Sequence, residues 1–235
     1  MKILVVAATV AEIQPLLTAI GNQGILQDGR LTSCSYKNLS VDILITGVGM
    51  VATAYHLGKV LALTPYRLAL NLGIAGSFNI HLAIGDVVNI NMDRFPEQGA
   101  QDGDSFLSLE DMNLVKSHDF PFTGGELINQ SIIENEILKT IPKVNGITVN
   151  TAHGNESSIE KIVGLFHPIT ESMEGAAFLY GCMMEGIPCA QIRAISNYVE
   201  RRNKNAWNIP LAIENLNQKA IAVLEDLTNC ETANI

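Results

Sequence analysis

The chain alternates between short aliphatic runs and segments whose apolar residues have helical spacing. A continuous aliphatic run of strand length, such as residues 2–8, is typical of a strand buried on both faces. In residues 12–20 the apolar positions share one helical face, and Pro15 is tolerated in the first turn of a helix. The same patterns predict further strands at 32–36, 41–46, 67–71, 86–91, 146–151, 169–173 and 190–196. They predict further helices at 51–63, 158–165, 175–185 and 210–227.

Strands that alternate with helices in this order predict an α/β fold. We expect a single domain over residues 1–235, with a central mixed β-sheet flanked by helices. Residues 73–77 (GIAGS) are too rich in small side chains for regular structure, so we expect a strand-to-loop junction there. Residues 93–111 are acidic and contain glycine, which predicts a loop that could border a site.

The composition predicts a sizeable core and a second subunit. Of the 235 residues 47% are apolar and 17% are charged, and a domain of this length can bury a core without a disulfide or a structural metal. The apolar content exceeds what a solvated monomer needs, so we expect a homo-oligomer, a dimer or larger. The net charge of −9 and the scattered basic residues argue against nucleic-acid binding.

The N-terminus and the cysteines favour a cytoplasmic protein. The apolar run in MKILVVAATVAE has strand length and no signal-peptide cleavage site follows it, and no apolar stretch reaches bilayer-spanning length. The four cysteines lack metal-binding spacing, and we expect reduced, buried thiols. They are Cys34, Cys182, Cys189 and Cys230. We therefore expect no membrane association, no metal and no cofactor.

Three polar residues, Glu12, Glu174 and Asn197, lie at or just past the ends of predicted strands. In α/β folds ligands collect at the carboxyl ends of strands, so these side chains are candidates for one shared pocket. For either carboxylate alone, a place in the first turn of a helix, where the helix dipole favours negative charge, is an equally good explanation. Arg193 lies inside an apolar strand, and a buried guanidinium needs a carboxylate or several carbonyls. An internal ion pair and a catalytic role are both open for it.

A glycine pattern at residues 47–52 (GVGMVA) follows a predicted strand and precedes a predicted helix, as in dinucleotide-binding motifs. No acidic residue closes the next strand to bind a ribose hydroxyl, and the pattern follows an internal strand rather than the first one. A close approach of backbone to a helix or a small ligand is the better explanation. His153 and His167 lie in loop-like segments without metal spacing, and neither is assigned a role.

Several motifs together resemble one enzyme superfamily. They are MKILVVAATVAE at the N-terminus, NLGIAGSF at 71–78, ESMEGAA at 171–177 and IRAISN at 192–197. Over almost its whole length the chain resembles the purine nucleoside phosphorylases and 5′-methylthioadenosine/S-adenosylhomocysteine nucleosidases. With DRFPEQGAQDGDSF and RAISNYVERRNKNAWNIPLAI included, it is most similar to the futalosine hydrolases. The resemblance implies a nucleoside phosphorylase-like fold and a small purine nucleoside as the ligand.

The resemblance also implies roles for individual residues. Glu174, beside Met173, accepts hydrogen bonds from the ribose hydroxyls and stabilises the positive charge that the sugar acquires as its bond to the base breaks. Glu12 positions and deprotonates the attacking water. The further substrate-binding residues implied are Gly73, Ile74, Gly76, Ser196 and Trp207. Ile74 stands where the nucleosidases have a small hydroxyl residue, while the two glycines let backbone N–H groups face the ligand.

Asn197 departs from the adenine-specific nucleosidases, which carry an aspartic acid here that protonates N7 of the base. An amide supplies no proton, but it donates a hydrogen bond to N7, as in phosphorylases that act on inosine and guanosine. Hypoxanthine, the base of futalosine, is therefore the expected leaving group. The alternatives are a methylthioadenosine/S-adenosylhomocysteine nucleosidase, a 6-oxopurine nucleoside phosphorylase and a non-catalytic nucleoside-binding protein.

Phosphorolysis needs donors for a phosphate dianion, and the arginines of the N-terminal third, Arg30 and Arg67, are not predicted at strand-end loops. A carboxylate at Glu12 would also repel phosphate, so hydrolysis is favoured. Futalosine carries a benzoate-bearing group beyond its 5′ carbon, and that carboxylate requires a cation. The candidates are Arg94, Arg201 and Arg202.

Overall fold

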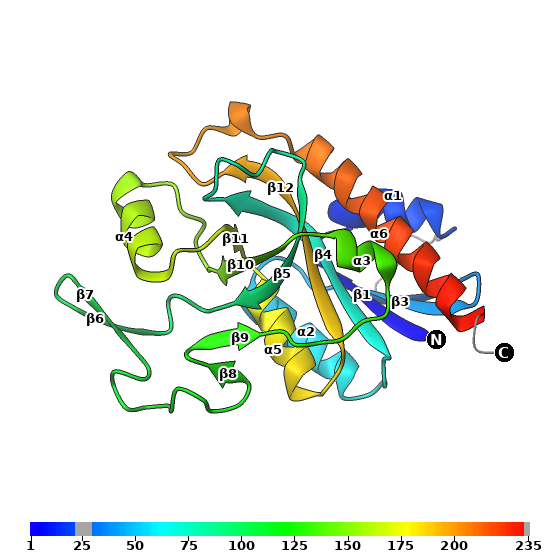
Figure 1. Cartoon of the computed structure of the whole chain (residues 1–235), viewed down its shortest axis with the longest axis horizontal. Coiled ribbons are helices and arrows are strands. Elements are labelled where there is room, and N and C mark those ends of the chain that lie inside the picture. Colours follow the sequence, from blue (N-terminus) through cyan, green and yellow to red (C-terminus); the bar gives the residue numbers. More distant parts are fainter. Residues whose placement is uncertain (22–29, 233–235) are drawn as a thin grey trace.

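The computed structural model describes residues 1–21 and 30–232. Its centre is a ten-stranded sheet with the order β2-β3-β1-β4-β11-β10-β5-β9-β8, in which β12 pairs with β4 and β5 (Figure 1). The strands of this sheet are β1 (Lys2–Ala7), β2 (Leu31–Tyr36), β3 (Leu39–Ile45), β4 (Leu68–Ser77), β5 (Val87–Asp93), β8 (Phe122–Thr123), β9 (Glu126–Ile128), β10 (Lys143–Thr148), β11 (Thr170–Ser172) and β12 (Cys189–Tyr198). The helices are α1 (Val10–Ala19), α2 (Met50–Leu61), α3 (Glu136–Thr140), α4 (Glu156–Phe166), α5 (Gly175–Met184), η1 (Lys204–Ala206) and α6 (Ile209–Thr232).

Alternation along β1 explains why helices cover both faces of the sheet. Successive side chains of a strand point to opposite faces. Ile3 and Val5 therefore join a core formed with α1, α3 and α6, whereas Leu4 and Val6 join a second core formed with α2 and α5. Figure 1 shows α1 and α6 on one side of the strands and α2 and α5 on the other. The predicted α/β fold with a mixed sheet between helices is confirmed.

Strand β12 closes part of the sheet into a ring. It runs parallel to β4 and antiparallel to β5. The ring continues because β5 pairs with β10, β10 pairs with β11, and β11 pairs with β4. The carboxyl ends of β4 and β12 and the end of β11 are thereby gathered at one place, which is where ligands collect in α/β folds.

The predicted helices and strands are present with boundaries that differ by a few residues. The first helix begins at Val10, ahead of the predicted start, because Thr9 and Glu12 form a capping box at its N-terminus. The last strand runs to Tyr198, so Asn197 lies within β12 rather than beyond it.

The prediction of an irregular segment at residues 73–77 is wrong. These residues continue β4 to Ser77, because β12 pairs with them in parallel along the whole segment and β11 pairs in antiparallel orientation with Gly76 and Ser77. The small side chains leave space for side chains of the neighbouring strand and do not form a turn. A β-carbon on Gly73 would lie 2.1 Å from Nη1 of Arg193, so only glycine leaves room for that guanidinium.

The prediction of a loop over residues 93–111 is also wrong in part. Asp93 ends β5, and the segment then forms a two-stranded ribbon of β6 (Gly99–Asp102) and β7 (Ser105–Ser108). Figure 1 shows this ribbon extending away from the central sheet. The short elements β8, β9, α3 and η1 were not predicted, since segments of so few residues carry no measurable periodicity.

Within the described part of the chain, no helix combines the length and the apolar character needed to cross a membrane. Cys182 and Cys189 are buried free thiols, as expected. Cys34 is also a free thiol but only half-buried, which differs from the expectation. Cys230 lies outside the described side chains.

Candidate active site

A cavity of about 390 Å³ lies at the ends of β4, β11 and β12. The structure brings to it nearly all residues that the sequence singled out. Those that line it are Glu12, Ile74, Gly76, Met173, Glu174, Ser196, Asn197 and Trp207. Gly73 is not among the lining residues, because the Arg193 guanidinium and the Glu12 carboxylate occupy the space beside it. A contact between the Gly73 backbone and a ligand stays a prediction.

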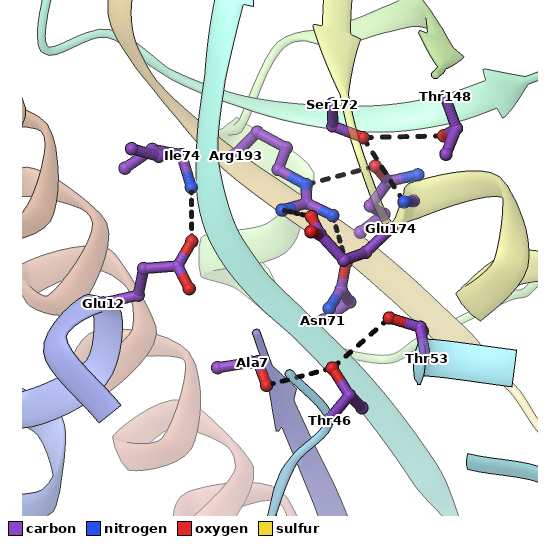
Figure 2. Close-up of polar contacts among 12 residues, drawn as sticks. Ala7, Glu12, Thr46, Thr53, Asn71, Ile74, Thr148, Ser172, Glu174 and Arg193 are labelled. Atoms are coloured by element: carbon purple, nitrogen blue, oxygen red, sulfur yellow. Dashed lines mark hydrogen bonds and ion pairs between the residues drawn. The ribbon is translucent and has the colours of Figure 1, made fainter. Parts of the chain in front are cut away.

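Glu12 combines the two roles that the sequence left open. Its Oε2 accepts hydrogen bonds from the backbone N–H and the hydroxyl of Thr9, both at 2.9 Å, so it belongs to the capping box of α1. Its Oε1 accepts from the backbone N–H of Ile74 at 3.3 Å (Figure 2). Burial raises the pKa of Glu12, against the opposing effect of Arg193 and with a further increase from Glu174. A carboxyl with a raised pKa is suited to accept a proton.

Glu174 is held from two sides. It precedes α5, and its Oε1 accepts a hydrogen bond from the backbone N–H of Gly49 at 3.0 Å. Its Oε2 lies 3.5 Å from Nη1 of Arg193 (Figure 2). Gly49 has a φ of 98°, which only glycine adopts without strain. The glycine pattern at residues 47–52 thus positions this carboxylate, which agrees with the close backbone approach inferred from the sequence.

Arg193 lies beneath the cavity and is 1% exposed. Besides Glu174, its guanidinium donates to Oδ1 of Asn71 at 2.6 Å and to Oε1 of Gln191 at 3.2 Å. Gln191 in turn donates to Asp93 at 2.9 Å. The prediction that a carboxylate meets this buried guanidinium is confirmed. Because Arg193 does not line the cavity, it acts on Glu174 from below as an internal ion pair.

The side-chain amide of Asn197 is hydrogen-bonded at both ends to its neighbours in the chain, Ser196 and Tyr198. Its Oδ1 accepts from the Ser196 hydroxyl at 2.7 Å, and its Nδ2 donates to the Tyr198 carbonyl at 2.9 Å. A carbonyl can only accept, so the nitrogen end of the amide is identified by this contact. One N–H of Nδ2 is left to donate to a ligand in the cavity.

The arginines considered for a 5′ carboxylate are separated by the structure. Arg202 lines the cavity, and its guanidinium lies 5.3 Å from the centre of the Trp207 ring. Arg94 lies at a different cavity, paired with Glu126 at 2.6 Å. Arg201 is exposed and does not line the site. Of the three, only Arg202 is in a position to meet a ligand here.

One prediction about the phosphorylase alternative is wrong. Arg30 does reach a strand end, since its Nη1 donates to the carbonyls of Thr46 at 3.0 Å and Ile45 at 3.4 Å, where β3 ends. It does not line the cavity. Arg67 lies at the start of β4, at the other end of the sheet, as expected.

His153 was not assigned a role from the sequence, yet it lines the cavity. Its Nδ1 is hydrogen-bonded to Oε2 of Glu171, and its backbone N–H donates to Oε1 of the same carboxylate at 2.9 Å. The sequence signal was weak, because the two residues are far apart along the chain and only the pairing of strands brings them together. His167 ends α4 with a φ of 46° and is not part of the cavity.

A family model described as the phosphorylase superfamily matches residues 2–229. The chain belongs to the phosphorylase superfamily. Within it, a futalosine hydrolase of Acidothermus cellulolyticus is 29% identical over 192 residues, which cover 79% of this chain and 75% of that protein. A 5′-methylthioadenosine/S-adenosylhomocysteine nucleosidase of Glaesserella parasuis is 22% identical, with 96% and 99% covered.

Solved structures of other proteins share the fold of this chain. Futalosine hydrolase of Helicobacter pylori superposes with a TM-score of 0.77 at 16% identity, covering 96% of this chain and 97% of that one. The resemblance stated from the sequence is therefore confirmed. The relatives that the chain matches are N-glycosyl hydrolases.

Proposed function

We propose that this chain hydrolyses the N-glycosidic bond of futalosine and releases hypoxanthine and dehypoxanthinylfutalosine, a step of menaquinone biosynthesis by the futalosine pathway. The observation that carries the proposal is one cavity that is lined by two buried carboxylates, Glu12 and Glu174, and by the amide of Asn197. Similarity to the futalosine hydrolase of Acidothermus cellulolyticus supports the choice of substrate.

Glu174 binds the ribose in this proposal. As the bond between C1′ and the base breaks, positive charge develops on the sugar, and a carboxylate that accepts from the ribose hydroxyls stabilises it. The contacts with Gly49 and Arg193 hold the carboxylate in place before the substrate arrives. A preorganised group of this kind needs no rearrangement during the reaction.

Glu12 activates the water in this proposal. Its carboxylate lines the cavity beside Ile74, and its raised pKa makes it a better base than an exposed glutamate. The water oxygen attacks C1′ while a water proton passes to the carboxylate. Glu12 therefore needs to be ionised before the reaction begins.

Asn197 selects a 6-oxopurine in this proposal. Its free N–H donates to the 6-oxo group of hypoxanthine, an acceptor that adenine lacks, whereas N7 is an acceptor in both bases. The 6-amino group of adenine is a donor, so it cannot accept a hydrogen bond from the N–H of this amide. A hydrogen-bonding mismatch of this kind discriminates strongly because it leaves buried polar groups unpaired.

Arg202 is the cation proposed for the benzoate carboxylate of futalosine. It shares the cavity with Trp207, whereas the adjacent Arg201 does not line it and serves as a matched control. Replacing Arg202 by alanine should raise KM for futalosine about tenfold or more and leave KM for inosine almost unchanged, since one charge-assisted contact contributes roughly 1.5–3 kcal/mol. Equal effects of the Arg201 and Arg202 replacements on both substrates would contradict this assignment.

Hydrolysis and phosphorolysis are separated by one assay. Base release from futalosine, inosine and methylthioadenosine is measured with and without phosphate. We expect hypoxanthine release from futalosine without phosphate, with dehypoxanthinylfutalosine as the other product, and little base release from methylthioadenosine. A requirement for phosphate would favour phosphorolysis. Preference for methylthioadenosine would favour the second nucleosidase activity.

A protein of a different class, a non-catalytic nucleoside-binding protein, would need Glu174 but not Glu12. It would bind hypoxanthine and release no base from any nucleoside in the same assay.

The homo-oligomer and the cytoplasmic location also stay predictions. Val51 and Tyr55 on α2, which are 78% and 60% exposed, form an apolar surface that agrees with a second subunit. Light scattering of the purified protein measures the oligomer size.

A further inference from the structure

His153 and Glu171 form a pair inside the cavity that the proposed reaction does not yet use. Nδ1 of the histidine is bonded to the glutamate carboxylate, and the histidine side chain is 14% exposed. Both residues line the cavity that holds Asn197. Hydrolysis of a purine nucleoside needs a proton donor for the departing base, and an amide at residue 197 cannot be that donor.

Strand pairing puts the pair across from Asn197. Glu171 is paired with Gly76 in the neighbouring strand, and Gly76 is paired with Asn197 on its other side. Residues paired directly across strands point to the same face. The side chains of Asn197 and Val199 lie over Gly76, and all three residues line the cavity. Two strand spacings separate Glu171 from Asn197 by about 10 Å of backbone. The two residues line the same cavity of about 390 Å³, a size typical of small-ligand pockets.

The contact with Glu171 decides which nitrogen of His153 is available. A hydrogen on Nδ1 is donated to the carboxylate, so Nε2 is the nitrogen left for a ligand. In the protonated ring Nε2 is a donor. The hydrogen bond with Glu171 raises the pKa of His153, although burial lowers it, and Glu97 adds to the increase. The other charged groups that line this part of the cavity are Glu200 and Arg202.

We propose that His153 is the acid that protonates the departing purine, with Glu171 as the residue that positions it. The inference rests on the proposed nucleosidase function. When the bond between C1′ and N9 breaks, its electron pair passes to the base, and the Nε2 proton of His153 follows onto a base nitrogen. The oxygen of water bonds to C1′ and its proton passes to Glu12. Solvent then restores the proton to His153 and removes the one on Glu12.

A purely structural role for the pair predicts a different result. Glu171 also accepts the backbone N–H of His153 and so holds the start of the loop that leads to α4. A change of the imidazole that only disturbed this loop would slow every substrate alike. A role as acid affects only leaving groups that need a proton.

The test compares two substrates that share ribose but differ in the leaving group. Inosine releases hypoxanthine, which needs a proton, whereas 4-nitrophenyl β-D-ribofuranoside releases a stable anion. We expect His153→Gln to lower kcat for inosine by roughly 10²- to 10⁴-fold, the usual contribution of general acid catalysis, and to change kcat for the nitrophenyl riboside by less than about threefold. His81→Gln, at an exposed residue outside the cavity, is the control.

Two further measurements keep the proposal testable if the variant folds poorly. In the wild type, kcat/KM for inosine should fall on the alkaline side as His153 loses its proton, and the nitrophenyl riboside should lack this fall. Glu171→Gln should move that alkaline limb to lower pH. Equal losses on both substrates, or the same alkaline limb for both, would overturn the assignment of His153. A wild type that releases no base from any purine nucleoside but cleaves the nitrophenyl riboside would instead contradict the proposed function.

Discussion

Gly73 and Arg193 lie directly opposite each other in β4 and β12, and Nη1 of the arginine occupies the space where a side chain at residue 73 would begin. The same Nη1 lies 3.5 Å from the carboxylate of Glu174. The absence of a β-carbon at one position of a strand thus permits a buried cation below the candidate ribose-binding residue. The contact between Arg193 and Glu174 thus links a buried residue of the core to a residue of the candidate site.

Gly73→Ala should therefore cost both stability and activity. The added carbon would stand 2.1 Å from Nη1, so the guanidinium has to move and its bonds to Asn71 and Glu174 break. Disruption of a buried pair typically costs about 3–5 kcal/mol of unfolding free energy. Denaturant unfolding and kcat/KM measure the two losses. Gly58→Ala in α2, where a β-carbon meets nothing within 4 Å, is the matched control and should raise stability by roughly 0.5–1 kcal/mol.

Glu12→Gln should abolish turnover without a large loss of stability. Burial raises the pKa of Glu12, which means that its ionised form is unfavourable in the folded protein. A group whose pKa is raised by folding stabilises the protein at low pH, and this stabilisation is lost as pH rises through the folded-state pKa. At neutral pH the buried charge of Glu12 therefore lowers the unfolding free energy, and the neutral side chain of Gln removes that effect. We expect the unfolding free energy at pH 7 to stay within about 1 kcal/mol of the wild type or above it. Retained hypoxanthine binding, measured by calorimetry, would show that the site is intact.

The activity of the wild type should fall in acid because Glu12 acts as a carboxylate. Its pKa lies above the ordinary value of 4.5, so the acid limb of kcat/KM is expected above that pH. The nitrophenyl riboside should share this limb, since attack by water is common to both substrates. A rate that stayed constant down to pH 4.5 would argue against Glu12 as the base.

Asn197→Asp should move the preference from hypoxanthine toward adenine. One oxygen of the new carboxyl still accepts from Ser196, while the other would lie near the Tyr198 carbonyl at the position from which the amide now donates. Because the new carboxyl oxygen and the Tyr198 carbonyl oxygen are both acceptors, their proximity favours the protonated form of the carboxyl. A protonated carboxyl is an acid that can protonate N7 of the base. We expect the ratio of kcat/KM for methylthioadenosine over inosine to rise at least about tenfold. Asn113→Asp, outside the cavity, should leave the ratio unchanged.

Asp93 should make the protein less stable as pH rises from acid toward neutral. Burial raises its pKa to about 6 from 3.8, against the hydrogen bonds that Gln191, Thr148 and the Arg94 backbone donate to it. Between these two pH values the folded protein binds the proton more tightly than the unfolded chain does, so stability falls as pH increases. Over pH 4 to 7 the unfolding free energy of the wild type should decrease relative to that of Asp93→Asn by on the order of 3 kcal/mol. A difference between the two proteins that does not vary with pH would contradict the raised pKa.

Local patterning was sufficient to predict the order of the main helices and strands. The aliphatic run of β1 and the helical spacing of α1 and α6 follow from burial on one or both faces, a property that each segment carries in its own residues. Motifs around Glu12, Glu174 and Asn197 were sufficient to bring those residues into one hypothesis. Their meeting at one cavity depends on the closure of β12 against β4 and β5.

Other features follow only from contacts between distant segments. The small residues of 73–77 predict a loop when considered alone, but Gly73 makes room for Arg193 in the adjacent strand, and Gly76 makes room for Val199 and Asn197. The pairing of His153 with Glu171 likewise has no local signal, because hydrogen bonds between residues far apart in sequence depend on strand order and register. The sequence therefore determined the elements and the family-like motifs, each from its own neighbourhood. Tertiary structure decided which polar groups share the cavity, since only the pairing of strands sets distances between them.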